Sequence, residues 1–495
     1  MLNVDVAIVG GGFGGSLMSL VLHRAGLSVA LIDRGHHPRF ALGESSTPIA
    51  NLVLGDLCQE YDLPRLAPLT KYGSWQTAYP ELGCGIKRGF SYFQQTDGQP
   101  FSTDAGHSSE LLVAASSSDQ HSDTHWLRQD VDQFLFNEAR SAGVFCFEDC
   151  DVVDLESCAD GVVLELASSR VRARFVIDAS GEGGFLAKRL KIEDRTHEMR
   201  TNSRAVFAHF SGVTRWRDIL TSRIISPADH PFDCDHAALH HVFDGGWMWQ
   251  LRFHDETVSA GFVQDCSPGA RFVHDSPSGL NAADEWNLWL DRFPAIAEQF
   301  STSNVVRPER GLCATKRLQR KLARVAGPWW ALLPNSAGFV DPLHSTGIAQ
   351  TLCGIERLAR VLIQSLGREE LETRLRDYEC CVLAELDLID QMVSSCFAAM
   401  GDFSKFVAAS MLYFAAATSY ERSRLTSASD YSSAFLLADD PGMQCLVRQM
   451  RERSLVVADA KQFAGELADA IRPYNLVGLC DPAVNNMYRR SALPE

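Results

Sequence analysis

The first 35 residues alternate between apolar runs and one glycine-rich turn. Apolar residues fill 4–9 and 28–32, and between them lie the glycines of 10–15 and a helical pattern at 16–25. A strand, a tight turn, a helix and a second strand in this order predict a βαβ unit. The pattern is typical of the opening of a parallel α/β sheet.

The segment 36–125 is less regular. It is rich in Pro, Gly and Ser and has only short apolar runs, which predicts loops and small strands. A helical pattern follows at 128–142, and strand patterns follow at 152–153, 162–166 and 171–177. We expect the last of these strands to rejoin the first sheet in parallel.

Residues 200–310 alternate apolar and polar positions. Runs at 204–210, 247–251 and 258–263 are separated by polar loops, a pattern typical of antiparallel strands with one buried face. Helical patterns dominate from 347 to the end. We therefore expect an antiparallel sheet followed by a helical region.

Charge and composition narrow the possible partners. The formal net charge of −16 opposes binding to phosphate backbones, so nucleic acid is not an expected partner. The fourteen cysteines include no CxxC pair, so we expect no metal or disulfide framework. The chain opens on a strand rather than on a basic and apolar leader, so we expect a cytoplasmic protein.

The longest apolar stretch lies between Lys405 and Glu421 and holds 15 residues. A membrane span needs roughly 20 residues, so we expect none here and interpret the stretch as a buried helix. Because the apolar pattern covers more than one face, a shallow contact with a membrane surface is the alternative.

The glycine-rich turn carries a dinucleotide-binding fingerprint. Three of its glycines permit the tight turn, the close approach of a pyrophosphate and close helix packing, and the helix amides would meet the phosphates. Asp33 closes the second strand and would accept hydrogen bonds from a ribose. The predicted contacts in the turn are Gly10, Gly12, Phe13, Gly14 and Gly15. A plain glycine turn is the alternative, and the fingerprint alone leaves FAD and NAD open.

Several further segments carry a family resemblance. Residues 37–48 contain His-Pro-Arg-Phe and Gly-Glu-Ser-Ser, 246–252 are Gly-Trp-Met-Trp-Gln-Leu-Arg, and 339–347 are Phe-Val-Asp-Pro-Leu-His-Ser-Thr-Gly. With 85–88 and 128–132, these segments resemble those of the flavin-dependent halogenases, in the lineage of the monodechloroaminopyrrolnitrin and tryptophan halogenases. This lineage lies within the flavoprotein monooxygenase superfamily, and the resemblance covers residues 1–365. The chain departs from the family pattern at Leu251-Arg252, where Ile-Pro is usual, and at Pro334-Asn335, where related hydroxylases have Gly-Asp.

The resemblance implies FAD, used as FADH2, and a chloride or bromide ion as cofactors. Beyond the glycine turn and Asp33, it implies these cofactor-binding residues: Arg39, Glu44, Ser45, Arg128, Asp178, Asn335, Gly338 and Asp341. It implies a halide site at Ser345, Thr346 and Gly347, where a turn at the start of a helix would present backbone amides to an anion.

The resemblance also implies four catalytic residues. Hypohalous acid formed at the cofactor would travel to a lysine beside the substrate, and Lys87 is the candidate; Lys71 is its rival, and a solvated surface charge is the plain alternative. Trp247 and Trp249 would face the same side of a strand and form a wall between flavin and substrate, unless they are ordinary core residues. His344 stands where tryptophan-specific relatives have a glutamate and would serve as a base or orienting group.

The expected function is halogenation of an electron-rich aromatic compound, of phenol, pyrrole or indole type, in secondary metabolism. A separate flavin reductase would supply reduced FAD, and the substrate would arrive free or bound to a carrier. A flavin-dependent aromatic hydroxylase is the first alternative, because it shares the fold and the cofactor. A non-catalytic FAD-binding protein is the second.

The expected fold class is α/β: a Rossmann-like FAD-binding module, an antiparallel substrate sheet and a helical C-terminal region. The FAD module would comprise residues 1–195, with 36–125 as a loop insertion, and a return segment at 311–365. The substrate domain would occupy 196–310, and the helical region 366–495.

Overall fold

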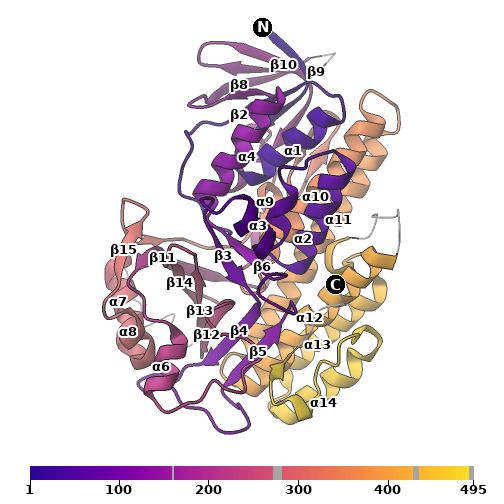
Figure 1. Cartoon of the computed structure of the whole chain (residues 1–495). Helices are drawn as coiled ribbons and strands as arrows, with labels where there is room; N and C mark the ends of the chain where they lie inside the picture. The colour runs from indigo at the N-terminus through magenta and orange to yellow at the C-terminus, as the bar shows by residue number, and fades with distance from the viewer. Residues whose placement is uncertain (159–160, 271–280, 427–433, 490–495) are drawn as a thin grey trace.

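The computed structural model describes residues 1–158, 161–270, 281–426 and 434–489. Parts of the predicted substrate domain, 271–280, and of the predicted helical region, 427–433 and 490–495, lie outside the described residues. Two sheets lie at opposite ends of the view in Figure 1, and the C-terminal helices run along one side of both.

The first sheet forms the upper part of Figure 1 and contains the βαβ unit. Strand β1 (Leu2–Val9) pairs in parallel with β2 (Val29–Ile32) and with β10 (Arg170–Asp178). The predicted βαβ unit and returning parallel strand are therefore confirmed. Within the described residues, the order is β18-β19-β10-β1-β2-β7, and β8 and β9 extend from β10 as a hairpin. The other strands are β7 (Phe145–Phe147), β8 (Val152–Cys158), β9 (Gly161–Leu166), β18 (Ala326–Gly327) and β19 (Trp330–Leu332).

Helices α1 (Phe13–Arg24) and α4 (Arg128–Ala142) pack together on the first sheet. The bounds of α4 are those that the pattern at 128–142 predicts. Gly143 ends this helix in the left-handed region, with φ of +107°, and its amide bonds back to carbonyls of the last turn.

The insertion 36–125 is more regular than the expected loops. Its helices are α2 (Pro48–Glu60), η1 (Ala67–Thr70) and α3 (Tyr72–Ala78), and its strands are β3 (Cys84–Lys87), β4 (Gly89–Gln94), β5 (Glu110–Ala114) and β6 (Asp123–Trp126). The side chain of Thr47 caps α2 and Pro48 starts it, a pairing that favours a helix start. The expectation of loops and small strands was therefore wrong for α2, where a capped and amphipathic segment forms a helix of 13 residues.

The second sheet recruits strands from outside residues 196–310. In the described residues, its order is β15-β11-β14-β13-β12-β4-β5-β21, with β16 paired to β11. It is antiparallel except at β12–β4 and β5–β21, which are parallel. The strands within 196–310 pair with one another antiparallel, which confirms the predicted antiparallel sheet. The parallel pairs involve β4, β5 and β21 from outside this range, and parallel neighbours need the long connections that these strands have. The remaining strands are β11 (Ser203–Ser211), β12 (Ala238–Phe243), β13 (Gly246–Arg252), β14 (Val258–Asp265), β15 (Asn304–Arg307), β16 (Cys313–Ala314) and β21 (Met487–Tyr488).

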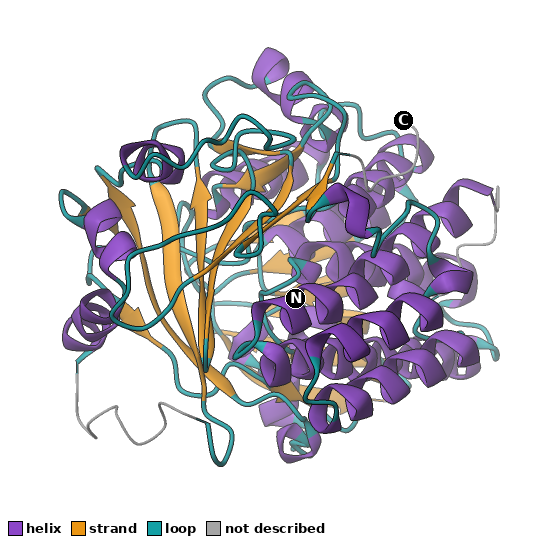
Figure 2. Ribbon diagram, turned by 90° about the horizontal axis from the view of Figure 1, so that it is seen from below, coloured by secondary structure: helices purple, strands orange, loops and turns teal. Residues whose placement is uncertain are grey.

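The two faces of the second sheet have different partners. Small helices α6 (Trp216–Ser222), α7 (Ala282–Arg292) and α8 (Pro294–Phe300) cover one face, and the C-terminal helices lie on the other (Figure 2). Alternate residues of a strand face opposite sides, so Met248 packs toward α7 and α8, whereas Trp247 and Trp249 join the main core.

The C-terminal part is helical, as predicted. Its helices are α10 (Thr346–Ser365), α11 (Leu371–Ala399), α12 (Phe403–Thr426), η4 (Phe435–Leu437), α13 (Pro441–Val456), α14 (Ala460–Ala470), η5 (Arg472–Tyr474) and η6 (Pro482–Val484). Helix α12 contains the apolar stretch between Lys405 and Glu421 and is mostly buried. Among the helices that the structure describes, none is long and apolar enough to cross a membrane.

Short elements connect these layers. They are η2 (Gly181–Gly183), α5 (Phe185–Arg189), η3 (Thr196–Glu198), β17 (Arg320–Lys321), α9 (Pro334–Ala337) and β20 (Gly338–Phe339). The predicted α/β class, with its helical C-terminal region, is confirmed.

Candidate active site

The glycine-rich turn has the geometry that the fingerprint requires. Gly10 has a φ of +112°, and a Cβ there would lie 2.4 Å from the carbonyl oxygen of Ala179. A Cβ on Gly15 would lie 1.9 Å from the carbonyl oxygen of Gly10, so α1 approaches the turn more closely than any larger residue allows. Gly12 precedes α1, and no side chain of the described residues caps that helix. The amides at its start therefore suit a phosphate.

Asp33 follows β2 and is held beside this turn. Its carboxylate accepts hydrogen bonds from the amides of Gly11 at 2.6 Å and Gly35 at 2.8 Å. Arg39 forms an ion pair with the same carboxylate at 2.9 Å. The structure brings these predicted residues together, and the contact of Asp33 with a ribose stays a prediction.

Arg128, the first residue of α4, joins three segments around the turn. Its guanidinium donates to both carboxylate oxygens of Asp132, at 2.8 and 2.9 Å. It also donates to the carbonyl oxygens of Leu42 at 2.6 Å and Gly43 at 3.1 Å, and it lies 4.7 Å from the centre of the Phe13 ring. A guanidinium whose nitrogens are fixed by these partners is a rigid hydrogen-bond donor, which suits the predicted contact of Arg128 with the cofactor.

Glu44 forms a buried pair with a histidine that the sequence did not single out. The Glu44 carboxylate lies 2.9 Å from Nε2 of His209, and both side chains are 1% exposed. Ser45 bridges to His125 through the backbone, and its hydroxyl forms no hydrogen bond with the described residues. Glu44 and Ser45 thus place polar atoms on the segment that Arg128 anchors.

Two predicted cofactor-binding carboxylates are buried and already bonded to the polypeptide. Asp178 accepts the amides of Ser180 at 2.8 Å and Leu186 at 2.7 Å, so it shapes the loop after β10. Asp341 accepts the hydroxyl of Ser203 at 3.0 Å, and burial raises its pKa to about 7. We infer that both residues position the loops around the cofactor, and their direct contact with it stays a prediction.

Asn335 and Gly338 lie in the return segment. Asn335 is exposed on α9. A Cβ on Gly338 would lie 2.5 Å from Leu386 Cδ1, so a glycine lets this segment pack closely on α11. The contacts of Asn335 and Gly338 with FAD stay predictions.

The predicted halide site lies at the start of α10. Ser345 precedes the helix in the left-handed region, with φ of +53°. Ser345 and Thr346 are buried, whereas Gly347 is exposed and a Cβ there would meet no atom within 4 Å. No side chain of the described residues caps α10. The first amides of a 20-residue helix therefore border open space, an arrangement that suits an anion.

Lys87 is buried rather than a surface charge. Its side chain is 0% exposed, and its ammonium donates to the Ser46 carbonyl oxygen at 2.6 Å and lies 4.1 Å from the centre of the Phe90 ring. Burial lowers its pKa to about 7, against the opposing effect of Asp123. Strands β3 and β6 place Lys87 and Asp123 opposite each other. Lys71 is only partly buried, at the start of α3, and the catalytic role of Lys87 stays a prediction.

The burial of Lys87 should make the free energy of unfolding depend on pH. Below pH 7 Lys87 is protonated in the folded and unfolded chains alike, whereas between pH 7 and about 10.4 the unfolded chain keeps a proton that the folded chain has lost. The free energy of unfolding therefore rises with pH in this window. From pH 7 to 9 the wild type should gain about 2–3 kcal/mol relative to Lys87→Met. Urea unfolding at both pH values measures this, and equal pH dependence in the two proteins would contradict it.

Trp247 and Trp249 lie side by side on one face of β13, as predicted. Their ring centroids are 6.1 Å apart, and the Trp249 indole donates to Ser259 Oγ at 3.2 Å. The opposite residue on β14 is Gly261, where a Cβ would lie 2.2 Å from Trp249. The glycine therefore makes room for the indole. Arg252, one of the two residues that depart from the family pattern, forms an ion pair with Glu256 within the β13–β14 hairpin.

His344 lies in an aromatic and histidine cluster that the sequence did not predict. It stacks on Tyr413 of α12 at 4.6 Å, and its Nε2 lies 3.6 Å from Cys396 Sγ. Burial lowers its pKa to about 3, so it is neutral near pH 7. Tyr413 also contacts the Phe90 ring, which lies beside Lys87. Ring contacts extend the cluster from Phe90 to Phe414, Tyr92 and His240, and His240 lies beside Trp247.

Several polar atoms of this cluster are buried without a hydrogen bond. Within the described residues, they are the Tyr92 hydroxyl and the Nδ1 atoms of His240 and His344. Burial lowers the pKa of His240 well below its usual value, and the charge of Lys87 lowers it further. The cluster therefore offers neutral hydrogen-bonding groups next to a single lysine.

Comparisons with known proteins identify the family of this chain. Residues 114–402 match the tryptophan halogenase family, and residues 5–206 match the FAD dependent oxidoreductases. The chain is 30% identical over 409 residues to monodechloroaminopyrrolnitrin halogenase PrnC of Pseudomonas fluorescens, which covers 81% of this chain and 69% of that protein. Tetracycline 7-halogenase of Kitasatospora aureofaciens is 29% identical over 400 residues, 79% of this chain and 69% of the relative.

A solved structure supports the fold. Halogenase PltM in complex with phloroglucinol and FAD superposes with a TM-score of 0.86, at 24% identity, over 99% of this chain and 100% of that one. The fold and the site define an FAD-dependent oxidoreductase. The chain belongs to the tryptophan halogenase family: it is a flavin-dependent halogenase that uses FAD and a halide ion.

Proposed function

We propose that this enzyme halogenates a small, free phenol bearing more than one hydroxyl group, with Lys87 as the residue that delivers the halogen. The observation that carries the proposal is the buried cluster beside Lys87, whose neutral polar atoms lack partners. Unpaired buried polar atoms favour a ligand that pairs with them. A polyhydroxylated ring supplies both the apolar faces and the hydroxyls.

His344 supports a phenol over tryptophan. An electrophilic halogen attacks a ring that can stabilise the developing positive charge, and a phenol does so through its own oxygen. A neutral histidine offers no negative charge to help a less activated ring. One relative of known structure, PltM, was captured with phloroglucinol, a ring of the proposed kind.

The roles of the chain's own residues follow from their positions. The glycine turn, Asp33, Arg39 and Arg128 would hold FAD. Once a separate reductase has reduced it, the cofactor would use molecular oxygen as the oxidant that converts halide to hypohalous acid. The amides at 345–347 would hold the halide. Trp247 and Trp249 would keep the aromatic ring away from the flavin, so that the halogen reaches it through Lys87. The Lys87 ammonium would give a proton to the oxygen of hypohalous acid, so that the bond between oxygen and halogen breaks and water departs as the halogen bonds to carbon. The proton that the same ring carbon then loses would restore the ammonium.

The substrate class is tested by comparing initial rates for trihydroxybenzene, resorcinol, pyrrole-2-carboxylate and tryptophan under identical reduced-flavin supply. We expect kcat/KM for the polyhydroxylated phenols to exceed that for tryptophan by about tenfold or more, because the unpaired polar atoms reject a ring without hydroxyls. A preference for tryptophan, or activity confined to a carrier-bound pyrrole, would contradict the proposal.

Tyr92→Phe should affect stability and substrate binding in opposite directions. The Tyr92 hydroxyl is buried without a hydrogen bond among the described residues, so its removal should raise the free energy of unfolding by about 1 kcal/mol. If the hydroxyl bonds to the phenol, KM should rise about five- to tenfold. Urea unfolding and steady-state kinetics measure the two effects. A KM unchanged from the wild type would remove Tyr92 from the substrate site.

A further inference from the structure

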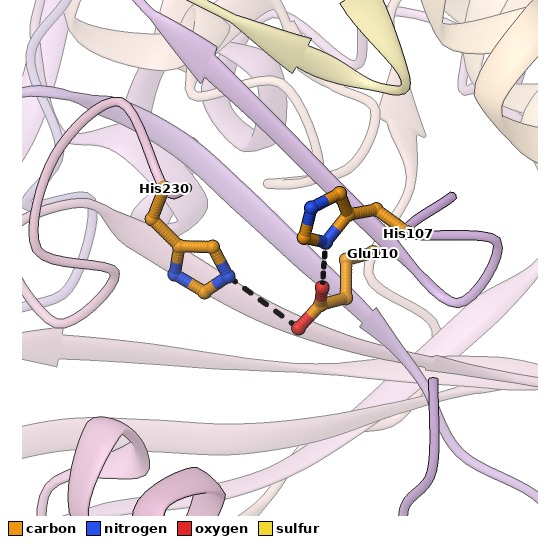
Figure 3. A group of neighbouring side chains, drawn as sticks. All are labelled: His107, Glu110 and His230. Carbon is orange, nitrogen blue, oxygen red and sulfur yellow. Dashed lines mark hydrogen bonds and ion pairs between the residues drawn. The ribbon is translucent and has the colours of Figure 1, made fainter. Parts of the chain in front are cut away.

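Two histidines and a glutamate meet at the start of β5, far from the glycine turn. Figure 1 shows β5 at the lower end of the molecule and α1 in its upper half. Nδ1 of His107 lies 2.6 Å from one carboxylate oxygen of Glu110, and Nε2 of His230 lies 3.5 Å from the other. Figure 3 shows both imidazoles pointing at this carboxylate, from two loops that are distant in sequence. One ligand atom of each residue lies within 4.8 Å of the other two.

The three side chains are buried, and their polar atoms are not fully used. The exposed fractions are 10% for His107, 0% for Glu110 and 2% for His230. Oε1 of Glu110 and both ring nitrogens of His230 form no hydrogen bond with the described residues. No Lys or Arg in the described part of the chain forms an ion pair with Glu110. A buried carboxylate without a fixed positive partner is costly, and a bound cation removes that cost.

We propose that His107, Glu110 and His230 bind one Zn²⁺ ion. Two imidazole nitrogens and a carboxylate oxygen are a donor set that zinc takes, with a water or a fourth ligand completing the tetrahedron. Nε2 of His107, the nitrogen that faces away from Glu110, lies 4.0 Å from a carboxylate oxygen of Asp229. A carboxylate behind a ligating histidine is the usual partner that orients the ring.

A neighbouring group of similar composition is a poorer candidate. Asp233, Cys234 and Asp235 also lie close together. Asp235 accepts the amides of Trp216 and Arg217, both at 2.9 Å, and Asp233 forms an ion pair with Arg217 at 3.0 Å. Asp235 thus caps α6 and Asp233 is paired with an arginine, so both carboxylates already have partners and the metal is assigned to the two histidines and Glu110.

Zinc at this site would join two segments of the second sheet directly and a third through His107. His107 and Glu110 lie at the start of β5, and His230 lies in the loop between α6 and β12. The carbonyl oxygen of His107 also accepts the side-chain amide of Asn486, next to β21, at 3.2 Å. The ion would therefore fasten the C-terminal strand and the His230 loop to the sheet, and we assign it a structural role.

The test uses the full-length protein, first freed of metal by a chelator, and titrates it with Zn²⁺ by calorimetry. We expect one equivalent to bind and to raise the melting temperature, since a ligand of the folded state stabilises it. His230→Ala and Glu110→Gln should each weaken binding by about 10–100-fold or more. Glu110→Gln keeps the size of the side chain, so it carries the test if His230→Ala does not fold. His197→Ala, at an exposed histidine outside the group, is the matched control and should bind as the wild type does.

The fourteen free cysteines could also bind zinc, so the experiment must show which atoms hold the metal. Co²⁺ in place of zinc should give the visible bands of a nitrogen and oxygen site without the near-ultraviolet thiolate band. A thiolate band, a wild type that binds no stoichiometric zinc, or unchanged affinity in both variants would each overturn the proposal. This test does not measure halogenase activity, so its result is independent of the test of the proposed function.

Discussion

Lys87→Met should lower the rate of aromatic halogenation by about 10²–10⁴-fold, the range expected for loss of a positioned proton donor. Lys87 is buried, donates to the Ser46 carbonyl oxygen at 2.6 Å and borders the aromatic cluster. Methionine has a similar length and no hydrogen-bond donor, so hypohalous acid would still form but would not be held beside the ring. Product yield by mass spectrometry and the escape of hypohalous acid to a soluble trap measure the two steps.

The control for this variant is Lys71→Met. Lys71 is partly buried at the start of α3, and its replacement should leave the rate within about twofold of the wild type, as expected for a surface substitution. FAD binding should be unchanged in both variants. Loss of activity in Lys71→Met, with activity retained in Lys87→Met, would transfer the catalytic role to Lys71.

Gly15→Ala should weaken FAD binding by about 10–100-fold, because the new Cβ would lie 1.9 Å from the carbonyl oxygen of Gly10. Both atoms belong to the backbone or sit directly on it, so no rotamer relieves the clash, and α1 must move away from the turn. The amides at the start of α1 would then lose their place against the phosphates. Quenching of FAD fluorescence on titration with protein measures the affinity.

The matched control for Gly15→Ala is Gly55→Ala. It lies inside α2, and a Cβ there would meet no atom within 4 Å. The same substitution should therefore stabilise the protein by about 0.5–1 kcal/mol, the usual gain for alanine within a helix. FAD affinity unchanged in Gly15→Ala would show that the tight packing of α1 is not needed for binding.

Local sequence patterns predict the features that depend on neighbouring residues of a single helix, strand or turn. The glycine turn, the bounds of α4 and the shared face of Trp247 and Trp249 each depend on spacing within one element. Family resemblance added Lys87 and His344, and the structure places both against the same aromatic cluster.

The rest of the site depends on contacts between distant segments. Tyr92, His240 and Tyr413 come from β4, β12 and α12, and no spacing in the sequence relates them. The pairing of Glu44 with His209 was hidden for the same reason. The Pro, Gly and Ser content of the insertion predicts loops, whereas the cap at Thr47 and the apolar spacing of α2 produce a helix there. The parallel pairing of β4 with β12 joins strands that are far apart in the sequence, so local patterns do not predict it.

Transfer of halogen to an aromatic carbon is the reaction that separates this enzyme from a hydroxylase of the same fold. The most direct measurement supplies the protein with FAD, a flavin reductase, NADH, oxygen, bromide and a trihydroxybenzene, and examines the product by mass spectrometry. We expect the isotope doublet of a brominated ring from the wild type and its loss in Lys87→Met. A product that gains oxygen without bromine, equally abundant in that variant, would instead indicate a hydroxylase.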